Sequence, residues 1–182
     1  MGLVPTDLDA VYDSVEASAV PSGGGGGLLP EGEYTGTVLE SVVGESMKPW
    51  VTAELKLKLQ VTEGEHSGKV TFCDVELAPN TDKSGQPNQK KLGFVKGQLA
   101  NLGYAGKISE VEYVAQNFVG AVIEFRQKVD THILEGGAFD QYARINPNTN
   151  QPYVDREVYV NKLVTPGFAQ AAPAAPSEPQ VY

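Results

Sequence analysis

Alternation of apolar and polar residues over positions 51–61 constrains the fold of this chain more than any other feature. One phase is apolar and holds Val51, Ala53, Leu55, Leu57, Leu59 and Val61. The other is polar and holds Thr52, Glu54, Lys56, Lys58 and Gln60. A period of two indicates a strand with one face on a core and the other in water. A strand-like segment precedes it, and a turn at Gly64–Gly68 leads into a further strand, Val70–Leu77. We therefore expect a curved three-stranded antiparallel sheet, the first half of a small barrel.

The composition of the two ends divides the chain of 182 residues into three parts. Residues 1–27 are acidic and include a run of five glycines, and residues 167–182 are rich in Ala and Pro. Because neither end has the apolar content that offsets the entropy of ordering a chain, we expect a flexible N-terminal extension and a flexible C-terminal tail. The remaining residues, 28–166, are of a normal size for one domain.

The formal net charge is −9, and its distribution matters more than its size. All 14 basic residues and 18 of the 23 acidic ones lie within 28–166, so that part carries −4. The segment 83–107 contains five lysines and no acid. The acidic total argues against coating nucleic acid through bulk charge, but it leaves room for a local anion site.

In the second half of the chain, the spacing of apolar residues changes from that of a strand to that of a helix and then returns to that of a strand. Apolar residues at helical spacing predict a helix over 87–102, and Ser109 with Glu112 has the spacing of a capping box. Alternation returns at 121–128, and two more strands are expected at 139–145 and 156–164. We therefore expect a small antiparallel barrel of five or six strands, with one or two helices between strands 3 and 4. This is the topology of the OB fold.

Three segments of the chain carry a resemblance to a known family. They read LPEGEYTGTVLESVV, VTEGEHSGKVTFCDVEL and KLGFVKGQLANLGY. Over about 29–130 the chain resembles small bacteriophage proteins that are associated with replication and recombination genes and regarded as OB-type single-stranded DNA-binding proteins. The resemblance implies an OB-like barrel that binds single-stranded DNA, with a phage recombinase, polymerase or helicase as a partner through the tails.

The chain departs from that family in two places. The segment 131–155 is longer than we expect for the last hairpin of such a protein. The C-terminal tail has only Glu178 and the terminal carboxylate, although it ends in the aromatic Tyr182, whereas phage single-strand binders often end in a densely acidic tail.

Binding single strands without sequence preference requires cations for phosphates and aromatic faces for bases. The candidates are Trp50, Lys56, Lys58, Phe72, Lys90, Lys91, Lys96, Arg126, Lys128, Tyr142 and Arg144. Lys56 with Lys58, and Arg126 with Lys128, are spaced to share the outward face of a strand, and Tyr142 with Arg144 is expected to do so on a third. The competing interpretation is that these cations only make a strand face soluble.

Two aromatic residues each have two interpretations. Phe72 falls on the polar phase of its strand, so it either stacks on a base or covers a docked helix. Trp50 follows the loop GESMKP at the mouth of the first hairpin, where it either grips a ligand or plugs the end of the barrel.

The sequence offers no catalytic constellation and no cofactor motif. His66 and His132 are far apart and show none of the usual metal-ligand spacings, so no metal site is predicted. The five glycines precede no GK[ST] and form no phosphate loop. Cys73, the lone cysteine, is expected to pack as a small apolar residue.

The patterns favour a protein that binds single-stranded DNA and is not an enzyme, and the resemblance implies that it is phage-encoded and acts in replication or recombination. No membrane segment or signal pattern is found in the sequence, so the expected location is the host cytoplasm, and oligomers are compatible with this interpretation. The alternative is a virion structural or capsid decoration protein, which would place the chain in the virion.

Overall fold

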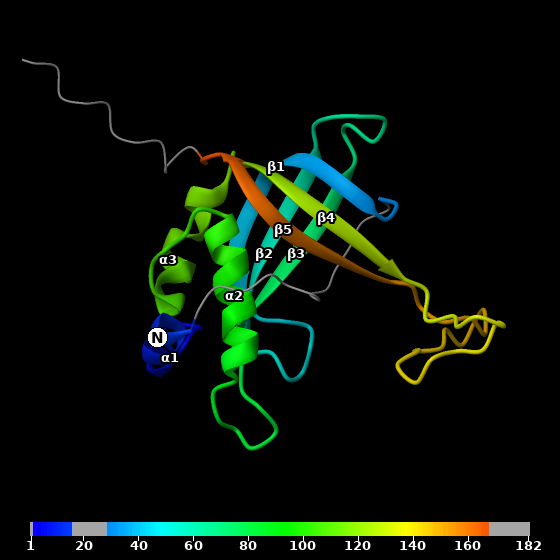
Figure 1. Ribbon diagram of the computed structural model, residues 1–182, viewed down its shortest axis with the longest axis horizontal. Coiled ribbons are helices and arrows are strands. Elements are labelled where there is room, and N and C mark those ends of the chain that lie inside the picture. The colour runs from blue at the N-terminus through cyan, green and yellow to red at the C-terminus, as the bar shows by residue number, and fades with distance from the viewer. Residues whose placement is uncertain (1, 16–28, 168–182) are drawn as a thin grey trace, which may run out of the picture.

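The computed structural model describes residues 2–15 and 29–167, which form a mainly β structure with a few short helices (Figure 1). The five strands are β1 (Gly32–Gly44), β2 (Ala53–Val61), β3 (Val70–Ala78), β4 (Val122–Asp130) and β5 (Asp155–Thr165). All neighbours are antiparallel, in the order β3-β2-β1-β4-β5. The predicted alternation is confirmed in β2, whose core-facing residues from Ala53 to Val61 are buried.

Strand β1 belongs to both halves of the sheet. Residues 32–37 pair with β4 and residues 36–44 pair with β2, with an irregularity between Val38 and Glu40. Gly36 lies where the two pairings overlap, and a Cβ there would stand 2.6 Å from the backbone oxygen of Gln60 and 2.8 Å from the ring of Phe125. Only glycine fits this position without a shift, which lets the strand bend inside the curled sheet.

The curl brings the edge strands β3 and β5 together without a ladder between them. The thiol of Cys73 lies 3.2 Å from the carbonyl oxygen of Val158. Beside it, the Gln98 amide donates to the carbonyl of Val160 and accepts from its N–H, both at 3.0 Å, and Asn101 donates to the same carbonyl at 2.8 Å. Side chains of a helix thus satisfy the β5 backbone where β3 would otherwise pair, and the sheet stays open.

That helix, α2 (Gln89–Asn101), follows β3 and covers the core. It begins after Asn88, whose side chain accepts from the N–H of Lys91, and Gly103 with φ +83° follows its end. Short helical turns follow at Ile108–Glu110 (η2), Val111–Val114 (α3) and Ala115–Phe118 (η3). The predicted capping box is wrong, because the hydroxyl and N–H of Ser109 donate to the carboxylate of Asp9 instead.

The N-terminal residues correct the expectation of a flexible extension. Residues Thr6–Leu8 (η1) and Asp9–Ser14 (α1) are helical and pack beside α2 (Figure 1). Val4, Leu8 and Tyr12 are buried in the core cluster, so this part of 1–27 belongs to the folded unit. The rest of the extension, from 16 to 27, and the tail beyond 167 lie outside the described residues.

A sixth strand is not formed at 139–145. The residues between β4 and β5, 131–154, form a long connection with only isolated bridges, Ile133 to Phe139 and Ile145 to Pro152. Figure 1 shows this connection reaching away from the sheet on the side opposite the helices. We call residues 131–154 the β4–β5 connection.

Candidate nucleic-acid interface

The face of β1, β2 and β3 opposite the core, here called the outer face, holds three of the predicted residues. Lys58 lies opposite Glu40 on β1 and Phe72 on β3, and Lys56 lies opposite Asp74 on β3. These five residues line a shallow pocket of about 400 Å³ under the β1–β2 loop. The alternation in β2 and β3 therefore places Lys56, Lys58 and Phe72 on one face of the sheet.

The lysines of the outer face lie among carboxylates. The ion pairs are Lys58 with Glu40 at 2.5 Å, Lys48 with Glu76 at 2.7 Å and Lys56 with Glu54 at 3.4 Å. Lys56 also donates to the backbone carbonyl of Glu45 at 2.7 Å. A phosphate that approaches this face must therefore compete with protein carboxylates for each ammonium group.

One carboxylate of the outer face is perturbed by its surroundings. Burial, together with the nearby carboxylate of Glu54, raises the pKa of Asp74 to about 6, although Lys48 and Lys56 act in the opposite direction. Glu54 itself is only 4 % exposed. Because Asp74 and Glu54 are crowded, the outer face becomes less negative when the pH falls below 6.

The two aromatic candidates are exposed. Trp50 is 64 % exposed in the β1–β2 loop, which excludes the interpretation that it plugs the end of the barrel. Phe72 is 47 % exposed on the outer face. Met47, in the same loop as Trp50, is 98 % exposed and lines the pocket with Phe72. Large apolar surfaces thus lie beside the Lys56–Lys58 pair.

The three lysines of α2 lie apart from the outer face. The ammonium of Lys96 donates to the carbonyls of Tyr12 and Asp13 at 3.1 and 3.2 Å, at the end of α1. Lys96 therefore fastens α1 to α2 and satisfies terminal helix carbonyls. Lys90 and Lys91 are exposed, and Lys90 lies 5.8 Å from the ring centre of Phe94.

The β4 candidates form a separate group on the sheet. Arg126 lies opposite Glu33 on β1 and Tyr159 on β5, with its guanidinium 5.5 Å from the ring centre of Tyr159. Lys128 lies opposite Glu157 and is exposed. Strand β1 separates this group from Lys56 and Lys58.

The expectation that Tyr142 and Arg144 share a strand face is wrong, because both lie in the β4–β5 connection. Tyr142 is 72 % exposed, and Arg144 forms an ion pair with Asp155 at 3.1 Å. Asp140 accounts for the missing strand, because its carboxylate accepts from the N–H of Tyr142 at 2.7 Å and favours a local turn over a ladder.

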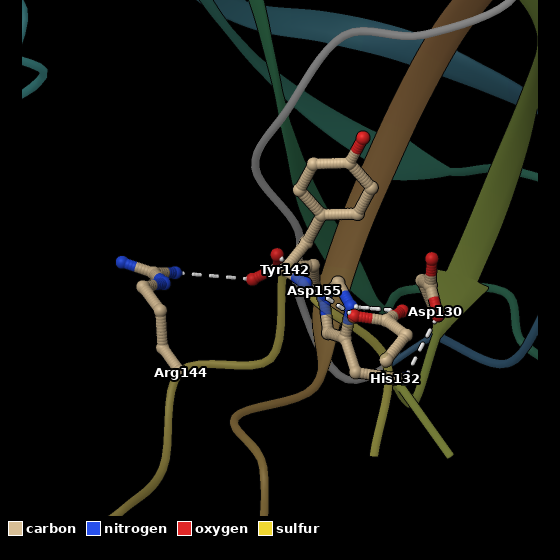
Figure 2. Close-up of polar contacts among 6 residues, drawn as sticks. Asp130, His132, Tyr142, Arg144 and Asp155 are labelled. Atoms are coloured by element: carbon tan, nitrogen blue, oxygen red, sulfur yellow. Dashed lines mark hydrogen bonds and ion pairs between the residues drawn. The ribbon is translucent and has the colours of Figure 1, made fainter. Parts of the chain in front are cut away.

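The same connection contains a polar cluster that the sequence did not predict (Figure 2). His132, 7 % exposed and at φ +56°, lies with Nδ1 2.9 Å from Asp140 Oδ2 and with Nε2 2.9 Å from Asp155 Oδ2. Contacts with Asp155 and Asp140 raise the pKa of His132. Asp140 and Asp155 are 8 and 23 positions from the histidine, so their spacing in the sequence does not predict that they meet at its ring.

Comparisons of the chain with protein-family models, with curated proteins and with solved structures found no match. None of the helices in 2–15 and 29–167 is long and apolar enough to cross a membrane.

Proposed function

We propose that this chain binds single-stranded DNA without strong sequence preference, as a bacteriophage protein of OB type that acts in replication or recombination in the host cytoplasm. Two features support an OB-like barrel. The sheet curls so that its two edge strands, β3 and β5, come together, and α2 lies between β3 and β4 in the chain. OB folds are five-stranded, partly open barrels that bind oligonucleotides on strands 2 and 3 and on the loops beside them.

The observation that carries the proposal is the exposure of aromatic side chains at that location. Phe72 lies on β3 next to Lys58, and Trp50 lies in the β1–β2 loop. An exposed aromatic ring costs solvation free energy that a buried one does not, and stacking on a base removes that cost. The lysines beside it supply cations for the phosphates that accompany the base.

The acids of the outer face limit the strength of binding. With Lys48, Lys56 and Lys58 as the phosphate contacts, the log–log slope of affinity against salt is about −2, at about −0.7 per contact. We therefore expect weak binding that needs low salt, in keeping with a protein that does not coat nucleic acid through bulk charge.

The test is a fluorescence titration of the full chain with oligo-dT at several salt concentrations. Trp50 is the only tryptophan, so stacking at this position quenches the emission directly. Phe72→Ala is expected to weaken binding by about 1–3 kcal/mol with little change in melting temperature. Tyr113→Ala is the matched control, because Tyr113 is 73 % exposed on α3, away from the outer face.

Three results would contradict the proposal: unchanged Trp50 emission at saturating DNA, a salt slope near zero, or equal affinity for duplex DNA of the same length. Phe72→Ala and Tyr113→Ala with equal effects would remove the outer face from the site.

A virion structural or decoration protein is the second candidate, and one observation favours it. The β4–β5 connection exposes many large apolar side chains, as a contact surface in an assembly would. They are Ile133, Leu134, Phe139, Tyr142, Ile145, Tyr153 and Val154. Failure to shift labelled poly-dT in a gel, together with detection of the chain by mass spectrometry in purified particles, would favour this candidate over DNA binding.

A further inference from the structure

His132 faces carboxylates with both ring nitrogens. Asp155 Oδ2 lies 2.9 Å from Nε2, and Asp140 Oδ2 lies 2.9 Å from Nδ1. A second carboxylate oxygen, Asp130 Oδ1, lies 3.9 Å from Nδ1. A neutral imidazole can donate from only one nitrogen, so the other would direct a lone pair at negative oxygens. A cation must therefore stand at one of the two nitrogens, and it is either a proton or a metal ion.

The contact between Asp155 and Arg144 indicates that Nε2 is the nitrogen of His132 that keeps its proton. Asp155 is oriented from its other side by Arg144, whose guanidinium donates to Oδ1 at 3.1 Å (Figure 2). A carboxylate that accepts one ring N–H of a histidine fixes the tautomer and leaves the other nitrogen as a ligand. Here that arrangement leaves the lone pair of Nδ1 directed toward Asp140 and Asp130.

The distances among the three remaining ligand atoms fit one metal ion. Nδ1 of His132 and one oxygen each of Asp130 and Asp140 all lie within 4.8 Å of one another. Two ligands bound at about 2.0–2.1 Å with tetrahedral angles are about 3.4 Å apart. The two separations from Nδ1, 2.9 and 3.9 Å, lie on either side of that value.

Backbone N–H groups hold both carboxylates. Oδ1 of Asp140 accepts from the N–H of Tyr142 at 2.7 Å, which leaves Oδ2 facing Nδ1. Oδ1 of Asp130 accepts from the backbone N–H of His132 at 2.8 Å, so its remaining lone pair is the one available to an ion. His132 is nearly buried, so its ring is already placed before an ion arrives. Such preorganisation lowers the cost of binding.

We propose that Asp130, His132 and Asp140 form a binding site for a divalent transition-metal ion such as Zn²⁺ at the base of the β4–β5 connection. One nitrogen and two carboxylate oxygens suit zinc, whereas magnesium and calcium take more oxygen ligands. The ion fastens residues 131–140 to the end of β4. This inference stands independently of the DNA-binding proposal.

The experiment is calorimetric titration of the untagged full chain with zinc chloride, followed by thermal melting with and without Zn²⁺. We expect one Zn²⁺ per chain and a higher melting temperature with the metal. His132→Asn and Asp140→Asn should each weaken Zn²⁺ binding by at least ~10-fold, the smaller end of the effect of altering even a supporting residue. His66→Asn is the matched control and should leave binding unchanged, because His66 lies 3.2 Å from Glu65 in the β2–β3 turn, outside the cluster.

The variant Asp130→Asn distinguishes a metal ion bound at Nδ1 of His132 from a proton on that nitrogen. Its amide oxygen can still accept the backbone N–H of His132, so the fold of the turn is kept, but a charged ligand is lost. The metal site predicts at least ~10-fold weaker Zn²⁺ binding for this variant as well. Absence of Zn²⁺ binding, equal affinity of wild type and Asp130→Asn, or an equal loss with His66→Asn would overturn the proposal and leave a protonated His132 as the bridging group.

Discussion

The substitution Asp74→Asn tests the electrostatics of the outer face, and its effect can be worked out from the structure. Asp74 has a pKa of about 6 in the folded chain, compared with 3.8 for an unperturbed aspartate. A difference of about two units corresponds to roughly 3 kcal/mol between the two protonation states. Because Asp74 is only partly buried, solvent screening reduces this, and we expect about 1–2 kcal/mol.

The direction of the effect follows from the raised pKa. The folded state favours the protonated acid, so the stability that Asp74 contributes is fully present below pH 3.8 and is lost as the pH rises through 6. Asp74→Asn cannot ionise and avoids this loss. The variant should therefore match the wild type near pH 4 and be about 1–2 kcal/mol more stable near pH 7.5.

Urea unfolding of both proteins at the two pH values measures this difference directly. Glu135→Gln, which removes an exposed acid from the β4–β5 connection, controls for net charge. A variant that is destabilised at pH 7.5, or whose difference from the wild type is the same at both pH values, would show that the charge of Asp74 does not oppose folding.

The same change bears on the proposed function. Neutralising Asp74 removes a negative charge next to Lys56, so oligo-dT should bind several-fold more tightly at low salt, and the gain should fade as salt screens the charge. Glu135→Gln should leave the affinity nearly unchanged. Equal gains in both variants would point to net charge alone.

Three further predictions concern the fold and its pH dependence. Gly36→Ala should cost about 1–3 kcal/mol in urea unfolding, because the added Cβ meets the backbone oxygen of Gln60 at 2.6 Å, whereas Gly44→Ala has open space and should be nearly neutral. Tyr12→Ala should cost about 3–5 kcal/mol, since this side chain is buried in the core, and a near-neutral result would contradict the docking of α1. The raised pKa of His132 means that its contribution to stability is complete below its unfolded pKa and is lost as the pH rises through the folded value, so a ring resonance followed by NMR in metal-free buffer should titrate above about 6.5.

Local patterns predicted the strands because the alternation follows from which face is buried. The phases of β2 and β4 are both confirmed, with Leu57 and Phe125 buried and Lys58 and Lys128 outside. The helix α2 was predicted for the same reason. The helix begins two residues later than predicted, at Gln89, because the side chain of Asn88 caps its first turn.

The wrong predictions concern segments whose local structure depends on contacts with side chains distant in sequence. Val4, Leu8 and Tyr12 have helical spacing, but they form part of the fold only because they dock on the core. Residues 139–145 have apolar and aromatic content compatible with a strand, but Asp140 is engaged by His132 and by a local N–H. In both segments tertiary contacts override the local pattern.

The charges around the candidate nucleic-acid interface also depend on contacts that the sequence does not predict. The sequence places Lys56 and Lys58 on one strand face, but it does not reveal which residues lie opposite them. Pairing with β1 and β3 sets Glu40 beside Lys58 and Asp74 beside Lys56, and each cation acquires a competitor for phosphate. Aromatic exposure is less sensitive to such neighbours, because a ring offers its face to a base whatever charges lie around it. The response of Trp50 and Phe72 to single-stranded DNA therefore tests the proposed function more directly than does any single lysine.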